Sequence, residues 1–130
     1  MKTEFTISTI LPAVPEKVFH AWLSSEGHSA MTGSPAKVDS RVGGTFTAWD
    51  GYITGKTLEM KPNSRIVQAW RTTEFSDDSP DSRLEILLEP TKKGTKLTLI
   101  HSNIPGDQTD SYESGWDESY FKPMKEYFGK

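Results

Sequence analysis

Hydrophobic and polar residues alternate along much of this 130-residue chain, which is the pattern of half-buried β-strands. The first such segment is Glu4–Leu11, which places Phe5, Ile7, Thr9 and Leu11 on one side. Six further segments follow, separated by turn residues such as glycine, proline and asparagine. They are Ala36–Asp39, Thr45–Trp49, Tyr52–Met60, Arg65–Thr72, Arg83–Glu89 and Thr95–Ser102. Because the connections are short, the pattern predicts antiparallel neighbours.

Two short helices are predicted between the first strand and the other six. Pro12 ends the first strand, and Pro15 occupies a position that tolerates proline in the first turn of a helix. Apolar residues then follow at helical spacing. They are Val18, Phe19, Trp22 and Leu23. A second helix over Ser25–Met31 is predicted to close near Gly33.

One strand has an irregular pattern. Ile53 and Gly55 have one parity, whereas Leu58 and Met60 have the other. A β-bulge near Lys56–Thr57 would bring all four residues to the core side and bend the sheet. The sequence therefore predicts a curved sheet.

The last segment, Ser111–Phe128, predicts one long helix of about 27 Å at ~1.5 Å per residue. Asp110 is the expected N-cap, with Glu113 as its reciprocal partner. Aromatic and apolar residues recur at three- and four-residue steps, so the helix has a broad apolar face. They are Tyr112, Trp116, Tyr120, Met124 and Tyr127, flanked by Phe121 and Phe128. Such a face fits the concave side of a curved sheet.

Gly115 and Pro123 are unusual inside a helix. Gly115, which has no side chain, is predicted to let the helix backbone approach its neighbour closely. Pro123 removes the hydrogen bond to the carbonyl of Ser119 and is predicted to kink the helix. A bent helix would follow a bent sheet.

Composition narrows the function classes. The formal net charge is only −3 and no basic cluster stands out, which argues against a nucleic-acid partner. There are no cysteines, and no apolar stretch approaches the ~20 residues of a membrane span. The start of the chain lacks the apolar core of a signal peptide. The expectation is one soluble, cytoplasmic domain over residues 1–130, either a monomer or a weak homodimer.

Two segments resemble a known family. Arg41–Arg71 (RVGGTFTAWDGYITGKTLEMKPNSRIVQAWR) and the tail GWDESYFKPMKEYFG resemble the activator of heat-shock protein 90 ATPase family, of the SRPBCC (START-like) superfamily. The resemblance implies an α+β helix-grip fold, in which a curved antiparallel sheet wraps around a long C-terminal helix. It also implies a groove or cavity between sheet and helix. The eukaryotic activator has a second, N-terminal domain that contributes much of the ATPase activation, and this chain resembles only the C-terminal one.

The sequence offers few candidates for catalytic, metal-binding or cofactor-binding residues. The three histidines, His20, His28 and His101, have no metal-binding spacing, and the glycine-containing segments lack a phosphate-loop or dinucleotide pattern. No metal, cofactor or catalytic residue is therefore predicted. His101 shares parity with Leu97 and Leu99 and is expected to face the core, either as a hydrogen-bonded structural imidazole or as a ligand contact or acid–base group. Gln68, also inward-facing, needs a polar partner.

The favoured interpretation is a non-catalytic protein that binds a small apolar or aromatic molecule between sheet and helix. The residues expected to line that space are Phe46, Ile53, Trp70, His101, Trp116 and Tyr120. Two alternatives remain open at this point. One is a chaperone-associated protein-interaction module with a heat-shock chaperone as partner. The other is a small cyclase- or hydrolase-like enzyme that uses His101.

Overall fold

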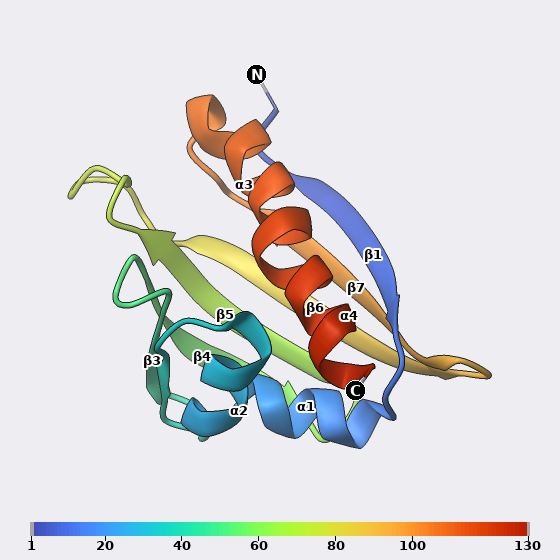
Figure 1. Ribbon diagram of the computed structural model, residues 1–130. Helices are drawn as coiled ribbons and strands as arrows, with labels where there is room; N and C mark the ends of the chain where they lie inside the picture. The colour runs from blue at the N-terminus through green and yellow to red at the C-terminus, as the bar shows by residue number, and fades with distance from the viewer. Residues whose placement is uncertain (1, 130) are drawn as a thin grey trace.

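The computed structural model describes residues 2–129 and shows a curved antiparallel sheet that wraps around a long C-terminal helix (Figure 1). The seven strands lie in the order β1-β7-β6-β5-β4-β3-β2. Their bounds are Phe5–Leu11 (β1), Lys37–Val38 (β2), Thr45–Ala48 (β3), Ile53–Lys61 (β4), Arg65–Thr72 (β5), Ser82–Thr91 (β6) and Gly94–Ser102 (β7). The predicted helix-grip fold is confirmed.

Two short helices follow β1, as the sequence predicts. They are α1 (Pro15–Trp22) and α2 (Ser25–Thr32). Pro15 stands in the first turn of α1, and the Ser24 hydroxyl accepts a hydrogen bond from the Gly27 amide at the start of α2. Gly33 ends α2 in the left-handed region with φ 80°. Both helices lie at one end of the sheet, below the long helix in Figure 1.

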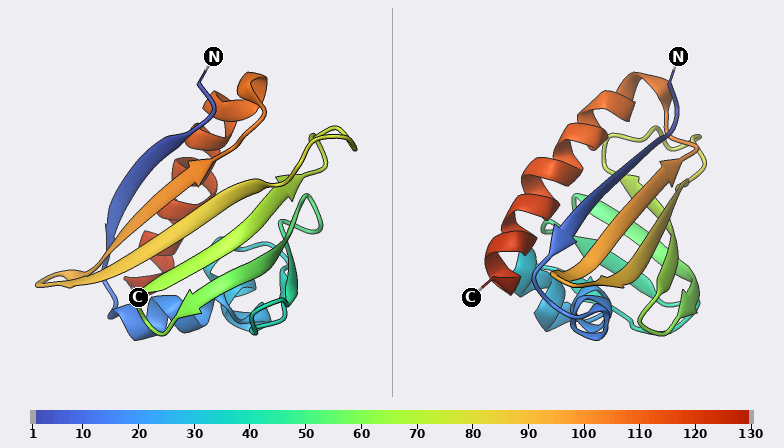
Figure 2. Two further views of the ribbon diagram at one scale, coloured as in Figure 1. Left: turned by 180° about the vertical axis from the view of Figure 1, so that it is seen from behind. Right: turned by 90° about the vertical axis from the view of Figure 1, so that its right-hand side faces the viewer.

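The C-terminal helix begins with the 3₁₀ turn η1 (Gly106–Gln108) and continues as α3 (Thr109–Gly115), the π-helical segment η2 (Trp116–Phe121) and α4 (Lys122–Phe128). It crosses the concave face of the sheet, and the side view in Figure 2 shows sheet and helix as two layers. The expected Asp110 cap is wrong, because the helix starts earlier and its N-cap position, Gln108, makes no side-chain cap. The Thr109 hydroxyl instead donates to the Lys2 carbonyl at 2.7 Å.

The π segment explains a second correction. Tyr112, Trp116, Tyr120 and Met124 are buried as predicted, but Tyr127 is 38% exposed. A π turn uses more residues than an α turn, so the face continues at steps of four. The next position is therefore Phe128, which packs against the core. The helix continues through Pro123, and the Lys122 amide before it bonds to the Asp117 carbonyl, five residues back.

The predicted bulge in β4 is present, but one position later than expected. The pairing register of β4 with β5 shifts between Thr57 and Glu59. Leu58 is consequently exposed, contrary to the prediction, whereas Thr57 and Ile53 face the core. Thr57 accepts a hydrogen bond from Gln68, so the inward polar residue of β5 finds a partner on the neighbouring strand.

Candidate functional site

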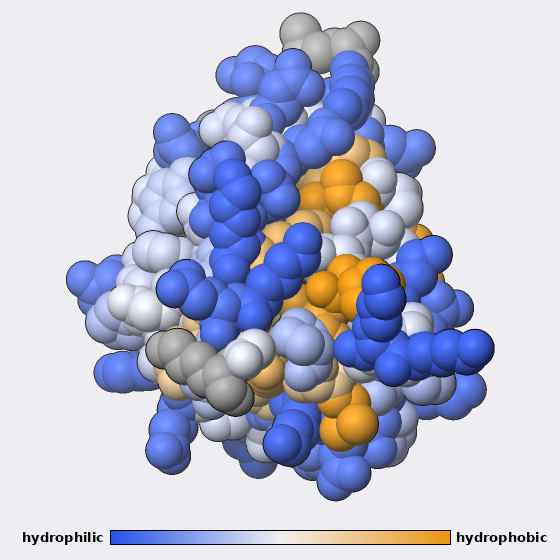
Figure 3. All heavy atoms as spheres, turned by 45° about the vertical axis from the view of Figure 1, so that its right-hand side comes forward, coloured by the Kyte–Doolittle hydropathy of each residue, from blue (hydrophilic) through white to orange (hydrophobic). Residues whose placement is uncertain are grey.

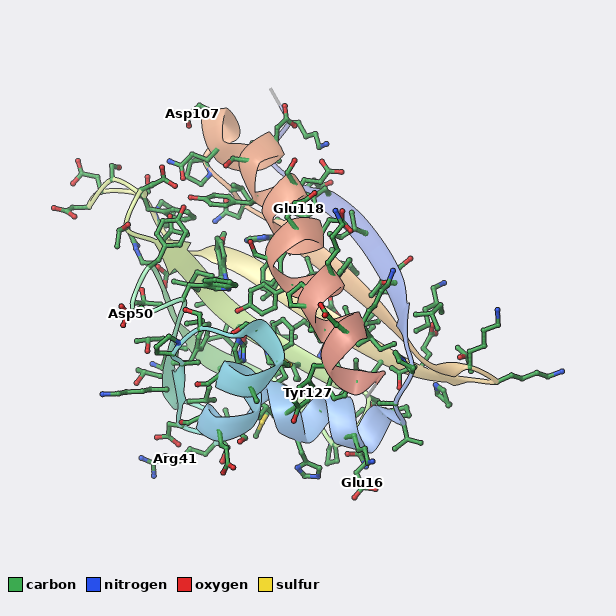
Figure 4. All side chains as sticks on the ribbon, viewed as in Figure 1. Glu16, Arg41, Asp50, Asp107, Glu118 and Tyr127 are labelled. Atoms are coloured by element: carbon green, nitrogen blue, oxygen red, sulfur yellow. The ribbon has the colours of Figure 1, made fainter. Side chains whose placement is uncertain are left out.

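A pocket of about 330 Å³ lies between the long helix and the sheet, beside the β3–β4 loop. The strands contribute Ile53 of β4 and Trp70 of β5, and the β3–β4 loop contributes Trp49 and Tyr52. Asp50, labelled in Figure 4, marks this loop. The helix supplies the remaining wall, which consists of Tyr112, Gly115, Trp116, Ser119 and Tyr120. The volume of the pocket is at the lower end of the range for small-molecule sites.

Four of the six residues predicted to line an interior space come together here: Ile53, Trp70, Trp116 and Tyr120. The other two, Phe46 and His101, are buried outside the pocket wall. The Phe46 ring covers Gly55, where an added Cβ would stand 2.5 Å from the ring. His101 packs against Trp70 and Trp116, and its ring centroid lies 4.6 and 6.0 Å from theirs.

Gly115 has a different role from the predicted one. Apart from its chain neighbours and the backbone of its own helix, no atom of the described residues lies within 4 Å of a Cβ built at this position, so close approach to another element does not explain the glycine. Its φ of −61° and ψ of −40° are ordinary helical values that any residue adopts. Because Gly115 has no side chain, it leaves space in the pocket wall. Ser119, four residues on and on the same face, is also small and keeps that space open.

Trp116 is held by His101 from strand β7. The indole Nε1 donates to His101 Nδ1 at 3.1 Å, so the imidazole proton lies on Nε2. That nitrogen donates to the Ser82 hydroxyl at 2.8 Å, which donates in turn to the Trp70 carbonyl at 2.6 Å. Burial lowers the pKa of His101 to about 3, so the ring is neutral near pH 7. His101 is therefore a neutral imidazole whose two ring nitrogens are both hydrogen-bonded within the protein.

Tyr120 is held in the same way by His28 from helix α2. His28 Nδ1 lies 2.9 Å from the Trp22 carbonyl and must donate to it, which leaves Nε2 as an acceptor. The Tyr120 hydroxyl donates to that nitrogen at 2.7 Å. Burial lowers the pKa of His28 and raises the pKa of Tyr120. Two neutral histidines from different elements thus fix two adjacent aromatic rings of the pocket wall.

The hydroxyl groups of the other two tyrosines of the wall are also hydrogen-bonded. Tyr112 donates to the Gln108 side chain, and its oxygen lies 2.7 Å from the Thr72 hydroxyl. Tyr52 donates to the Glu74 carboxylate. Burial, with a further contribution from Glu74, raises the pKa of Tyr52 to about 12. Both phenols therefore stay protonated at neutral pH.

The β3–β4 loop is the part of the site that the sequence did not reveal. Trp49 and Asp50 both adopt left-handed backbone conformations, with φ of 51° and 55°. That region is costly for a bulky residue, and such strain is typical of functional positions. The Trp49 indole N–H is also buried without a hydrogen-bond partner among residues 2–129. Only the tryptophan beside an Asp-Gly turn signalled this part of the site.

No group of three or more His, Asp or Glu side chains that could hold a metal lies within the described residues, and the chain has no cysteine. Across the same residues, no helix is both long and apolar enough to cross a membrane.

The comparisons with known proteins agree with this fold. The family model described as Activator of Hsp90 ATPase homolog 1-like protein matches residues 12–129. The human protein called Activator of 90 kDa heat shock protein ATPase homolog 1 is 25% identical over 127 residues, which are 97% of this chain and 37% of that protein. The chain therefore spans little more than a third of that relative's length.

Two solved structures extend the likeness. The structure of an HSP90 activator from Plasmodium falciparum superposes with a TM-score of 0.89 at 25% identity, covering 98% of this chain and 97% of that one. A protein from Chromobacterium violaceum superposes with a TM-score of 0.79 at 26% identity, covering 99% of both chains.

Proposed function

The chain belongs to the family of Activator of Hsp90 ATPase homolog 1-like proteins, and from this premise we propose that it is a non-catalytic binding protein for a small apolar or aromatic molecule. The proposed site is the pocket between the sheet and the C-terminal helix. The observation that carries the proposal is the pocket wall, in which six of nine residues are aromatic. Large apolar surfaces that line a concave space are typical of ligand sites.

The pocket wall is preorganised, which favours binding. His101 and His28 fix Trp116 and Tyr120 through hydrogen bonds, so neither ring has to be ordered when a ligand enters. The same bonds argue against the enzyme alternative. Both ring nitrogens of His101 are occupied, its side chain is fully buried, and its low pKa keeps it neutral.

The binding proposal is tested with N-phenyl-1-naphthylamine, a neutral aromatic probe whose emission rises in apolar surroundings. Three of the four tryptophans, Trp49, Trp70 and Trp116, line the pocket, so their emission is expected to change as the probe binds. Gly115→Leu places a side chain in the open space and is expected to abolish binding. Ser114→Leu adds the same side chain at the exposed neighbouring position and is expected to leave binding unchanged. Equal affinity of the wild type and Gly115→Leu would contradict the proposal.

A second candidate function is a chaperone-interaction module, which is favoured by the names of the relatives. The P. falciparum protein is called an HSP90 activator, and the match covers 97% of that chain. This chain also has an apolar surface outside the pocket. Figure 3 shows a band of hydrophobic residues on the face where β1 and the C-terminal helix come forward. Ile10 and Val14 are 40% and 54% exposed.

This second candidate is tested by measuring the ATPase rate of a heat-shock protein 90 chaperone with and without the chain. The surface around Val14 includes a groove lined by Ala13, Tyr127 and Phe128, among others. If this surface binds the chaperone, Val14→Glu is expected to remove any stimulation. Val42→Glu, at an equally exposed valine outside that groove, is the control. An unchanged ATPase rate with the wild-type chain would contradict the candidate.

We further propose that residues 1–130 act as one domain, that the protein works in the cytoplasm, and that it is a monomer or a weak homodimer.

A further inference from the structure

The wall of the pocket carries no charge of its own. The nine wall residues include no charged side chain, and six of them present aromatic rings. An aromatic ring carries negative potential over its face and attracts cations that come to lie on it. The ring faces of the wall therefore favour a positive group over a negative one, and the Trp49 N–H, unpaired within the described part of the chain, is a neutral donor that adds no positive charge.

Carboxylates lie close to two phenols of the wall. Glu74 accepts the Tyr52 hydroxyl proton, and both Glu74 and Asp107 act to raise the pKa of Tyr112, although burial is the larger cause. Asp50 follows Trp49 directly in the strained loop. Figure 4 labels Asp50 and Asp107, which come from the loop and from the start of the long helix.

Two basic residues near these elements are already paired. The Arg71 guanidinium binds Asp81 at 2.8 Å and the carbonyls of Ser76 and Ser79 at 2.9 and 3.1 Å. Lys122, in the turn after Ser119, binds Glu118 at 2.8 Å. Their charges are largely offset by these carboxylates, so neither residue reverses the sign of the field at the pocket.

The three phenol groups of the wall offer acceptors rather than donors. Tyr52 donates its proton to Glu74, Tyr112 donates to Gln108, and Tyr120 donates to His28. A phenol has a single proton, so none of these groups has a proton left to donate to a ligand, and the Tyr112 oxygen already accepts from the Thr72 hydroxyl. A carboxylate ligand would find neither a cation nor a phenol proton among these groups. An ammonium ligand would find the aromatic rings of the wall and, beside Tyr52, the Glu74 carboxylate.

We propose that the pocket selects an organic cation with an apolar body, such as an alkylated or quaternary ammonium compound, and excludes organic anions of the same shape. This inference rests on the proposed function, because it names the ligand class of the same pocket. The aromatic wall binds the apolar body and the charged group together, and Glu74 strengthens the attraction from the rim.

Three small probes with nearly the same shape test the proposal. Phenyltrimethylammonium is the cation, tert-butylbenzene is its neutral isostere, and 2-methyl-2-phenylpropanoate is the anion. Each displaces N-phenyl-1-naphthylamine from the wild-type protein if it binds. The cation is expected to bind at least about tenfold more tightly than the neutral isostere, the difference that one desolvated cation–π contact supplies. The anion is expected to bind more weakly than both.

The outcomes separate the two proposals. If the neutral isostere binds as tightly as the cation, the charge selection is wrong and the binding function stands. If neither these compounds nor N-phenyl-1-naphthylamine binds, the proposed function fails and the inference fails with it. If the anion binds most tightly, the inference is overturned.

A pair of variants on one loop isolates the contribution of Glu74. Glu74→Gln is expected to lower the affinity for the cation severalfold and to leave the affinity for tert-butylbenzene unchanged. Asp78→Asn removes an exposed carboxylate from the same loop and is expected to change neither affinity. An equal loss for both probes in Glu74→Gln would mean that Glu74 only supports the loop, which contradicts its proposed role.

Discussion

The two halves of the C-terminal helix contact the sheet in different ways. In the first half, Gly115 and Ser119 leave a pocket between the helix and the β3–β4 loop. In the second half, Phe121 and Met124 are buried, and Met124 has no exposed surface at all. One amphipathic helix therefore produces both an open and a closed interface. The first half stays open for two reasons. Gly115 and Ser119 are small, and the element opposite them is a loop that carries Trp49 rather than a packed strand.

The π segment lies where the two interfaces meet. It contains Trp116, Ser119 and Tyr120 of the pocket wall, together with the buried Phe121. π turns occur frequently at functional sites. This one lets Trp116 and Tyr120 face the pocket while Met124, on the same face, closes the core.

The largest expected effect is at this junction. Trp116→Ala is expected to lower the free energy of unfolding by about 3–5 kcal/mol, since the indole is buried and bonded to His101. Asp117→Ala, at the next and exposed position, is expected to change it by less than about 0.5 kcal/mol. Urea unfolding measures both variants. Equal losses would contradict the assignment of the two faces.

Matched truncations test the open and closed halves directly. Met124→Ala is expected to cost about 2–5 kcal/mol, because it empties a fully packed site. Ser119→Ala removes only a hydroxyl that borders the pocket and is expected to cost less than about 0.5 kcal/mol. Thermal and urea unfolding give both values. A large loss for Ser119→Ala would show that its hydroxyl makes a structural bond.

The histidine that supports Trp116 makes stability depend on pH. The pKa of His101 is about 3 in the folded protein and about 6.5 in the unfolded chain, so between these values only the unfolded state binds the proton. Its contribution to stability is complete above about pH 6.5. It falls by about 1.4 kcal/mol per pH unit below that. The pKa of His28 is also lowered by burial, which adds to the loss in the same direction.

Urea unfolding between pH 7.5 and pH 4.5 measures this slope. His101→Gln is expected to be less stable at pH 7.5 and to show a shallower dependence on pH. His20→Gln, at an exposed histidine, serves as the control. Titration of the His101 ring followed by NMR provides an independent check. A midpoint near 6.5 in the folded protein would contradict the assignment.

A smaller effect is expected when the open half is given a better helix former. Gly115→Ala is expected to stabilise the protein by about 0.5–1 kcal/mol, because its backbone is helical and the new methyl group has free space. The same methyl group narrows the pocket, so probe affinity is expected to fall. A stabilised protein with unchanged affinity would show that the glycine is not needed for binding.

The smallest effect is expected at Pro123. The Lys122 amide already bonds five residues back, so the turn before the proline is widened and accommodates its ring. Pro123→Ala is therefore expected to leave the free energy of unfolding within about 0.5 kcal/mol of the wild-type value. A gain of more than 1 kcal/mol in urea unfolding would show that the proline strains the helix.

Most of the fold was predictable, because strand alternation and helical spacing depend on which side chains must leave water. The stripe on the C-terminal helix predicted the burial of Trp116, Tyr120 and Met124, and parity predicted the burial of Trp70 and His101. Predictions made one residue at a time were less reliable. The bulge displaced Leu58 to the surface, and the π segment displaced Tyr127, because each adds a residue that a regular period does not contain.

The sequence by itself determined which rings are buried, but only the tertiary structure decided which of them border empty space. Phe46 and Trp70 both face inward, yet Phe46 is used to cover Gly55 and Trp70 borders the pocket. Tyr52 and Trp49 join the wall from a loop that is distant in sequence from the helix residues of the same pocket. A pocket is the volume that side chains from distant segments leave unfilled. No local pattern of residues determines this volume, because it depends on how the helix packs on the sheet.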